Sequence, residues 1–498
     1  MKKLYDILNW IDGKILWGIP MIAVILCSGI FLTVLLRFLQ LRRFGFCLKH
    51  TIGDSVKQMK KKEKKSENPN AISPFEAFST AVSGTVGTGN IVGVTTAIIS
   101  GGPGAVFWMW ISAFFGMVTK YCEITLGLFF RKKDETGEYV GGPMYYIENG
   151  LGRKWKWLAV LFAVFTMLAA VGMSSVQADT IQSTWNTAFK IPTIVTACVI
   201  AALTALVVLG GIKRIGKVTS MIVPFMAILF IIMALILIFA NVTAVPAAFA
   251  SIFTSAFTAK SVIGGFAGYG IAQAMRYGFA RGIFSNEAGL GSSTIAHSTA
   301  TQKEPVKQGA WGVFEVFLDT FVICTLTALL VLTSGIATDA GSAGATVAMT
   351  AFTNVLGMFG SVIFSIILPL FAFSTILAWA VYGGKACQYL FRNKMAKTVF
   401  NIVFTVLIVV MAVITTLGGD GLGTDFVWLI SDMTNALMAL PNIVALVALG
   451  GLTVKITKNY FDRKAGKDIE PMLSAYHDMN EEQIQALHEE EEEEQMAL

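Results

Sequence analysis

Long apolar stretches recur along the whole chain, separated by short polar connections. A helix of roughly 20 apolar residues spans about 30 Å, the thickness of the hydrocarbon core of a bilayer. We count about eleven stretches of this length. They are Ile15–Leu36, Phe75–Ser100, Ala105–Phe130, Trp157–Val176, Ile191–Leu209, Val218–Ala240, Val262–Phe284, Trp311–Leu332, Ser361–Tyr382, Val399–Leu417 and Phe426–Leu452. The pattern predicts an all-α integral membrane protein with about 11 transmembrane helices.

The composition supports this interpretation and excludes other classes. Apolar residues other than glycine make up 55% of the 498 residues, and charged residues make up 14%. A soluble domain has about 45–50% apolar residues with glycine included, and about 25% charged residues. A soluble chain this apolar could not cover its surface with polar groups. The six cysteines lie in or beside apolar stretches, so we expect small buried hydrophobic residues rather than disulfides.

Basic residues collect in every second connection between the apolar stretches. These are residues 37–65, 131–133, 213–217, 303–307 and 392–397, and the tail from Lys455. Positive charge is retained on the cytoplasmic side of a membrane. We therefore expect the N-terminus outside and the C-terminus in the cytoplasm. The acidic run from Glu489 to Glu494 predicts a solvated, disordered end.

Two of the stretches contain glycine clusters that oppose a continuous helix. The second contains Ser83-Gly84-Thr85-Val86-Gly87-Thr88-Gly89-Asn90, and the seventh contains Gly264–Gly270. Each interior glycine costs a helix about 1 kcal/mol relative to alanine, so both clusters favour local unwinding. Stretches five crossings apart run in opposite directions. This is the layout of a secondary transporter with two inverted five-helix repeats, whose site lies where both helices break. Close helix packing through glycine is the alternative explanation.

This layout divides the chain into four parts. Residues 1–66 form an accessory transmembrane helix with a basic cytoplasmic segment, 67–241 the first repeat, 242–454 the inverted second repeat, and 455–498 a cytoplasmic acidic tail. A channel is less favoured, because the filter-like sequence from Thr85 to Gly89 occurs once. A membrane enzyme is not favoured, because no HExxH or GxSxG motif occurs and the four histidines lie outside the apolar stretches. A sensor would need a signalling domain, and the tail after Leu452 is short and charged.

Several longer strings resemble the alanine/glycine:cation symporter family. They are GTVGTGNIVGV, GGPGAVFWMW, GGPMYYIENGLG, RGIFSNEAGLGSS, FLDT and FAFSTILAW, and in order they cover nearly the whole chain. The resemblance implies a fold similar to that of the leucine transporter (LeuT), with a 5+5 inverted repeat. It also implies import of small neutral amino acids, chiefly alanine and glycine, driven by a sodium gradient. Some relatives carry glutamine, which leaves a larger substrate open. We expect sodium as a co-transported ion, with no cofactor and no nucleic-acid partner.

The resemblance also implies roles for individual residues. The cation (sodium) site would use carbonyl groups of Ser83, Val86 and Phe371 and hydroxyl groups of Ser374 and Thr375. Oxygen ligands suit a hard cation, although serine and threonine in membrane helices often bond their own backbone. Amides near Thr88 and Gly89 would hold the substrate carboxylate. Gln177, which closes the fourth apolar stretch, would line the pocket, with a place at the membrane face as the alternative. Trp379 would wall the pocket or only pack. The full set of expected substrate-binding residues is Thr85, Thr88, Gly89, Asn90, Gln177, Gly268, Gly270, Gln273 and Trp379.

Charged residues inside the apolar stretches are costly and call for partners. Lys120 and Glu123 lie three residues apart on one predicted helix, so we expect them to pair. The remaining candidates for gating or ion pairs are Arg276, Arg281, Glu287 and Asp319. The first three could latch an inner gate or anchor the seventh helix at the interface. Asp319 could hold a second cation, carry a proton, or be a hydrogen-bonded buried acid. Lys385 departs from the family, which commonly has an acidic residue after Tyr-Gly in this helix.

Overall fold

The computed structural model describes residues 2–54, 71–258, 267–336, 344–417 and 422–496. The fold is nearly all helical, with one two-stranded hairpin formed by β1 (Lys132–Lys133) and β2 (Tyr139–Val140). In the N-terminal half the α-helices are α1 (Lys2–Ile11), α2 (Ile19–Leu35), α3 (Leu39–Arg42), α4 (Phe44–Leu48), α6 (Pro74–Thr85), α7 (Val92–Gly101), α8 (Gly104–Phe129), α9 (Pro143–Gly150), α10 (Lys156–Phe189), α11 (Thr193–Val208) and α12 (Gly211–Ala240).

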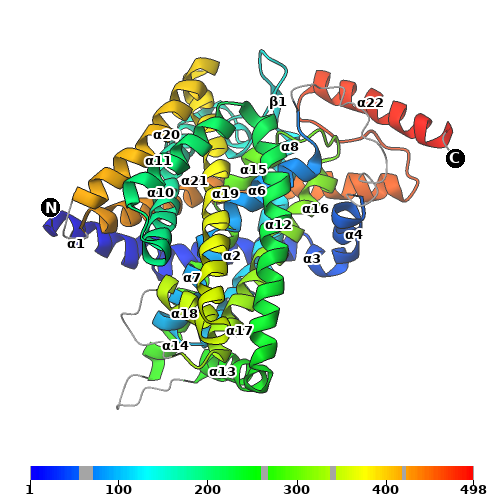
Figure 1. The fold of residues 1–498 in the computed structure, drawn as a ribbon. Coiled ribbons are helices and arrows are strands. Elements are labelled where there is room, and N and C mark those ends of the chain that lie inside the picture. Colours follow the sequence, from blue (N-terminus) through cyan, green and yellow to red (C-terminus); the bar gives the residue numbers. More distant parts are fainter. Residues whose placement is uncertain (1, 55–70, 259–266, 337–343, 418–421, 497–498) are drawn as a thin grey trace.

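The C-terminal half continues in the same manner (Figure 1). Its α-helices are α13 (Val245–Phe257), α14 (Ala267–Asn286), α15 (Ser292–His297), α16 (Pro305–Val316), α17 (Thr325–Thr333), α18 (Gly344–Leu356), α19 (Met358–Phe391), α20 (Lys394–Leu417), α21 (Leu422–Lys464) and α22 (His477–Met496). Short π- or 3-10 segments are η1 (Asp12–Leu16), η2 (Lys49–Gly53), η3 (Thr88–Asn90), η4 (Arg153–Trp155), η5 (Val242–Ala244) and η6 (Phe317–Cys324).

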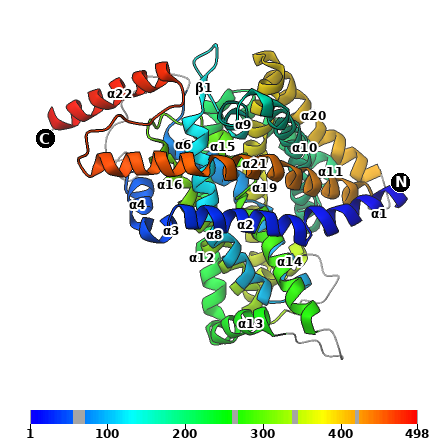
Figure 2. The same ribbon diagram turned by 180° about the vertical axis from the view of Figure 1, so that it is seen from behind.

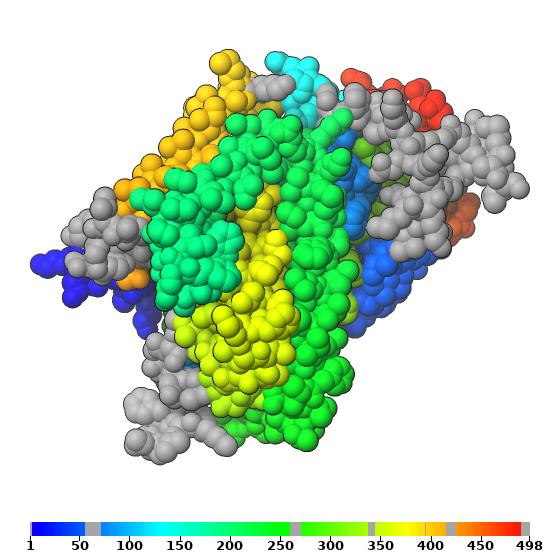
Figure 3. All heavy atoms as spheres, viewed as in Figure 1, coloured from blue at the N-terminus to red at the C-terminus, as the bar shows by residue number. Residues whose placement is uncertain are grey.

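The membrane-spanning elements agree with the apolar pattern. Within the described ranges, eight helices are long and apolar enough to cross a membrane, and the bent pair α6–α7 makes a ninth. The predicted stretches Ile191–Leu209 and Val262–Phe284 correspond to α11 and α14, which fall outside that count. Large apolar side chains of α11 and α12 are exposed on the face drawn in Figure 3, as a lipid-facing surface requires.

The first predicted break is confirmed. Helix α6 begins with a capping box, in which Ser73 and Glu76 each accept a hydrogen bond from the other's backbone N–H. It ends at Thr85, and α7 continues after a 56° bend. Gly87 and the short η3 turn form the break, as the glycine cluster predicts.

The second break lies elsewhere than predicted. Part of the Gly264–Gly270 cluster, residues 264–266, lies outside the described residues, and the rest forms the start of α14. The helix breaks instead between Asn286 and Ser292, where Glu287, Gly289 and Gly291 all have positive φ angles of 53°, 97° and 77°. Two glycines in the left-handed region end a helix more firmly than a local glycine-rich composition does.

The basic connections gather at one end of the molecule. Arg131 donates hydrogen bonds to the carbonyls of Ala300 and Gln302, and Arg463 pairs with Glu304 at 2.9 Å. Their common side agrees with the alternation of charge, and their cytoplasmic placement stays a prediction. The expectation of a disordered tail is wrong for the described part, because residues 477–496 form α22. Glutamate, glutamine, alanine and leucine are good helix formers, which outweighs the charge repulsion along this segment.

The N-terminal helices lie outside the two repeats but against both. Figure 2 shows α2 alongside α21 and crossing in front of α8 and α14. An added Cβ at Gly289, in the second break, would lie 3.2 Å from Ile25 of α2. The accessory helix therefore touches the second break directly.

Candidate functional site

The first break is held by two side-chain amides. The backbone N–H of Gly87 donates to Asn90 Oδ1 at 2.9 Å, and that of Thr88 donates to Gln177 Oε1 at 3.4 Å. Gln177 does not close its helix, as its place in the apolar stretch suggested, because α10 runs on to Phe189. It therefore lies inside the bundle, where its amide reaches the unwound backbone.

Helix α19 closes around the same break. Gly87 lies so close to Thr375 that an added Cβ would be 2.4 Å from its Oγ1. The hydroxyls of Ser374 and Thr375 donate to the carbonyl of Phe371 at 2.9 and 3.0 Å. Both hydroxyls are thus bonded to the backbone of their own helix, and Thr375 lies beside Gly87, where the family resemblance implies a cation site.

Further along α19, two aromatic residues wall this region. Tyr382 OH donates to the carbonyl of Ala81 in α6 at 3.4 Å. Trp379 is completely buried and packs edge-on against Tyr382 with ring centroids 5.4 Å apart. Its indole N–H has no hydrogen-bond partner among the described residues. Ser83 and Thr85 are also buried, and their hydroxyls bond to carbonyls of their own helix.

Asp319 joins the two broken helices. It lies in η6, a π-helical segment between α16 and α17, and π segments are frequent at functional sites. Its carboxylate accepts hydrogen bonds from Asn90 at 2.6 Å, from Ser285 at 3.0 Å and from Thr320 at 2.8 Å. Asn90 belongs to the first break, and Ser285 lies in the last turn of α14, just before the second. We did not predict Ser285, although it stands in the SNEAGLGS string that carries the resemblance.

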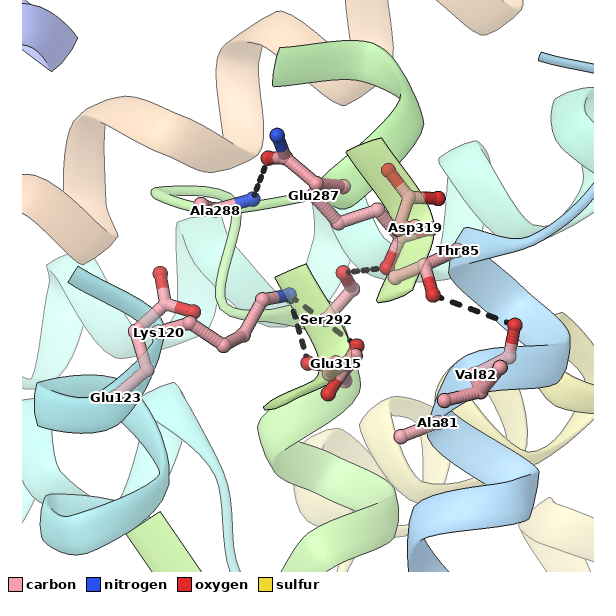
Figure 4. Close-up of polar contacts among 12 residues, drawn as sticks. Ala81, Val82, Thr85, Lys120, Glu123, Glu287, Ala288, Ser292, Glu315 and Asp319 are labelled. Atoms are coloured by element: carbon pink, nitrogen blue, oxygen red, sulfur yellow. Dashed lines mark hydrogen bonds and ion pairs between the residues drawn. The ribbon is translucent and has the colours of Figure 1, made fainter. Parts of the chain in front are cut away.

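The second break is stabilised by buried acids. Glu123 of α8 accepts hydrogen bonds from the Gly289 backbone N–H at 2.9 Å and from Asn442 at 2.7 Å. Glu287 accepts from the Ser292 hydroxyl, which closes the turn on itself (Figure 4). One freed backbone N–H at this break, that of Gly289, is therefore satisfied by a carboxylate from another helix. Asn442, in α21, was not singled out from the sequence.

The predicted pairing of Lys120 with Glu123 is wrong. Lys120 Nζ instead lies 3.7 Å from Glu315 of α16 and donates to Ser293 at 2.8 Å (Figure 4). Glu315 also contacts His297 Nε2 at 3.0 Å. His297 lies outside the apolar stretches in sequence, yet it is completely buried. Packing of α8 against α16 decides these partners, since Glu123 turns towards the break.

Several predicted residues are not brought to the breaks. Gly268 and Gly270 lie in the first turn of α14, about 27 and 24 Å of helix before Asn286 at 1.5 Å per residue. Gly270 is exposed and Gln273 is half-buried. Their assignment as substrate contacts followed from the misplaced break, and the structure does not bring them to the cluster around Asp319.

Arg276 and Arg281 lie on the opposite side of the break from the basic connections. The helix continues beyond the break to His297, so these arginines are not at its inner end. Arg281 lies 4.0 Å from Asp432 of α21. The expectations that these arginines lie in the inner half and that the basic connections are cytoplasmic therefore cannot both hold, because the apolar stretch was taken to end at Phe284. Glu287, in contrast, lies within the break itself.

Lys385 pairs with the β-hairpin. Its Nζ lies 2.7 Å from Glu138 Oε1, and Lys397 Nζ lies 3.3 Å from the same oxygen. Burial would raise the pKa of Glu138, but the two lysines outweigh it and hold that pKa below its ordinary value. A lysine in α19 is therefore matched by a carboxylate on the neighbouring connection.

The chain is similar in sequence to a known family of transporters. The model of the sodium:alanine symporter family matches residues 1–474. The sodium/alanine symporter AgcS of Methanococcus maripaludis is 39% identical over 90% of this chain and 95% of its own. The probable sodium/glutamine symporter GlnT of Bacillus subtilis is 35% identical over 94% and 93%, respectively.

The solved structure of MhsT in complex with L-phenylalanine matches the fold alone, with a TM-score of 0.52 at 14% identity over 78% of this chain and 98% of that one. The all-α, LeuT-like fold with two broken helices is thus confirmed. Family and fold are those of multi-pass secondary transporters that couple amino-acid transport to a cation, and not of enzymes. The chain belongs to the sodium:alanine symporter family.

Proposed function

We propose that this protein imports small neutral amino acids, alanine and glycine, by sodium symport with alternating access. The observation that carries the proposal is the cluster around Asp319, which ties Asn90 of one break to Ser285 at the other. A site shared by two half-helices changes whenever either one moves, which is what alternating access requires. We place the protein in the cytoplasmic membrane, with the N-terminus outside and the C-terminus inside.

In this proposal the cation binds between the first break and α19. The carbonyls of Ser83, Val86 and Phe371 and the hydroxyls of Ser374 and Thr375 are its ligands. The hydroxyls now donate to Phe371, and a rotation about χ1 would turn their oxygen lone pairs to the ion. An all-oxygen ligand set suits an alkali cation.

The amino acid binds next to this site. Its carboxylate takes the place of Gln177 Oε1 at the N–H of Thr88, near Gly89, in the positive field at the start of a half-helix. Thr85, Asn90, Gln177 and Trp379 complete the pocket. Because Gln177 now fills the place next to Thr88, it also limits the length of the side chain that fits there.

The second candidate is the same mechanism with glutamine as main substrate. A relative that is 35% identical is named a probable sodium/glutamine symporter. Alanine and glutamine differ in side-chain length, so the length of the pocket near Gln177 would decide which of them binds. The ion site does not contact the substrate side chain and would be the same for both.

The test is uptake of radiolabelled alanine into proteoliposomes under an imposed sodium or proton gradient. We expect sodium-driven uptake that glycine blocks. Thr375→Ala should remove most of the sodium dependence, whereas Thr166→Ala should not. Thr166 is a matched control, because it is equally buried and its hydroxyl also bonds its own helix, at 2.8 Å. Uptake that only a proton gradient drives would refute sodium coupling, and inhibition by glutamine alone would favour the second candidate.

A further inference from the structure

Charged residues from three elements meet on the side of the breaks where the N-terminus lies. Asp12 of η1 is 8% exposed, although it belongs to the accessory N-terminal segment. It interacts electrostatically with Asp432 of α21 and with Arg281 and Arg276 of α14. Arg281 Nη2 lies 4.0 Å from Asp432 Oδ2. Two acids and two arginines thus share one region, in which Asp12 is buried and the Arg281 and Asp432 side chains are 26% and 18% exposed.

The N-terminal segment is fixed against this region by direct contacts. Trp17 Nε1 donates to the carbonyl of Asp432 at 3.0 Å. The Trp17 ring meets Phe284 edge-on, with centroids 6.2 Å apart. At Gly13 an added Cβ would lie 3.0 Å from Arg276 Nη2, so the π-helical turn packs directly on the arginine. The backbone N–H of Trp17 bonds the carbonyl of Asp12 at 2.7 Å and closes that turn.

The electrostatic balance gives Asp12 a function in this cluster. One carboxylate oxygen of Asp12 and one of Asp432 have no hydrogen-bond partner in the described part of the chain. Buried carboxylates without partners are costly, and two of them repel each other. Arg281, which lies 4.0 Å from Asp432 and also attracts Asp12, offsets part of both costs. Each acid therefore contributes to holding the arginine in place.

The cluster is connected to the transport site by one turn of α14. Arg281 is followed by Phe284 and Ser285, and Ser285 donates to Asp319. An added Cβ at Gly89, in the first break, would lie 3.6 Å from the Phe284 ring. Arg281 is therefore connected through α14 to residues that contact both breaks.

We propose that Asp12 is a positioning residue, which holds Arg281 against Asp432 in a gate that closes this side of the site. The accessory N-terminal segment is thereby part of the transport machinery and not only a membrane anchor. This inference rests on the transport function proposed above, because a gate has meaning only for a carrier.

The test compares Asp12→Asn with Asp6→Asn, an exposed acid in the adjoining α1. A thiol introduced by Gly93→Cys reports on the gate, because an added Cβ there has Arg281 Cδ as its nearest atom, at 4.0 Å. The exposed Cys27 and Cys198 are replaced by alanine in the full-length protein, and a water-soluble maleimide is the probe. We expect Asp12→Asn and Asp432→Asn to label at least threefold faster than the parent protein, and Asp6→Asn at the parent rate.

A second readout separates gating from general loosening. Cys122, which is fully buried in α8, should stay unreactive in Asp12→Asn, and Asp12→Glu should restore slow labelling at the introduced thiol. Equal labelling rates in Asp12→Asn and Asp6→Asn, with Asp432→Asn still faster, would overturn the inference. An equal increase in the labelling rate of Cys122 would also overturn the inference. If the parent protein takes up no alanine under a sodium gradient, the proposed function fails, whereas the labelling rates still decide whether Asp12 holds Arg281.

Discussion

The contact between Gly87 and Thr375 makes a quantitative prediction. An alanine Cβ at position 87 would lie 2.4 Å from Thr375 Oγ1, far inside ordinary van der Waals contact of about 3.5–4.0 Å. Overpacking of this kind costs about 1–3 kcal/mol. That corresponds to about a 5- to 150-fold change in an equilibrium constant. We expect Gly87→Ala to lower both the thermal stability and the sodium affinity by amounts in this range.

The double variant Gly87→Ala/Thr375→Ala separates the two effects. Without the hydroxyl, the nearest remaining atom of residue 375 is its Cβ, 3.5 Å from the added methyl, which is an ordinary contact. The melting temperature should therefore recover. The sodium dependence of alanine uptake should not recover, because the Thr375 hydroxyl is a proposed ion ligand. Melting is measured by tryptophan fluorescence in detergent, and uptake in proteoliposomes over a series of sodium concentrations.

Gly89→Ala is the stability control. The added Cβ would have Phe284 Cδ1 as its nearest atom, at 3.6 Å, so no overlap arises. Its melting temperature should match that of the parent protein. The steric reasoning is refuted if Gly87→Ala melts at the same temperature as Gly89→Ala, or if removal of the Thr375 hydroxyl fails to restore stability.

Three further changes test other parts of the site. Asp319→Asn weakens hydrogen bonds worth about 1.5–3 kcal/mol each, so alanine uptake should fall at least tenfold at unchanged protein content. Gln177→Ala frees the N–H of Thr88, and glutamine should then compete better with labelled alanine; unchanged competition would contradict our placement of the pocket. Because the pKa of Glu138 is lowered, its pairing with Lys385 stabilises the protein above the ordinary glutamate pKa and is lost as the pH falls through the lowered value. The melting temperature should drop in acid, and less steeply in Glu138→Gln.

The first break could be predicted because its cause is local. The glycines from Gly84 to Gly89 lower helix propensity within a few residues, and the structure breaks there. The same reasoning placed the second break about 20 residues too early, at the denser cluster Gly264–Gly270. The actual break depends on the positive φ of Gly289 and Gly291 and on Glu123, which satisfies the freed N–H from another helix. Composition within one stretch contains no information about that partner.

Side-chain partners were the least predictable part. Spacing along one helix suggested a Lys120–Glu123 pair, but in the folded protein Lys120 forms its ion pair with Glu315 of another helix. Gln177 was predicted to line the pocket through the resemblance alone. A place at the membrane face stayed open as the alternative, because the fourth apolar stretch was taken to end at this residue, whereas α10 continues to Phe189. Helix length is set by packing of α10 along α19, which a hydropathy pattern does not report.

Applied to the proposed transport cycle, the hydrogen bonds at the two breaks account for the return of the empty carrier. Unwound backbone in a membrane must be satisfied, or the helix would rewind. Here the N–H groups of Gly87, Thr88 and Gly289 are bonded to Asn90, Gln177 and Glu123, all from within the protein. In the binding mode proposed above, the substrate carboxylate replaces Gln177 as the acceptor at the N–H of Thr88, so this contact contributes only the difference between the two hydrogen bonds. The empty site then stays stable while the carrier changes its orientation. The substrate is also bound weakly enough to dissociate on the other side.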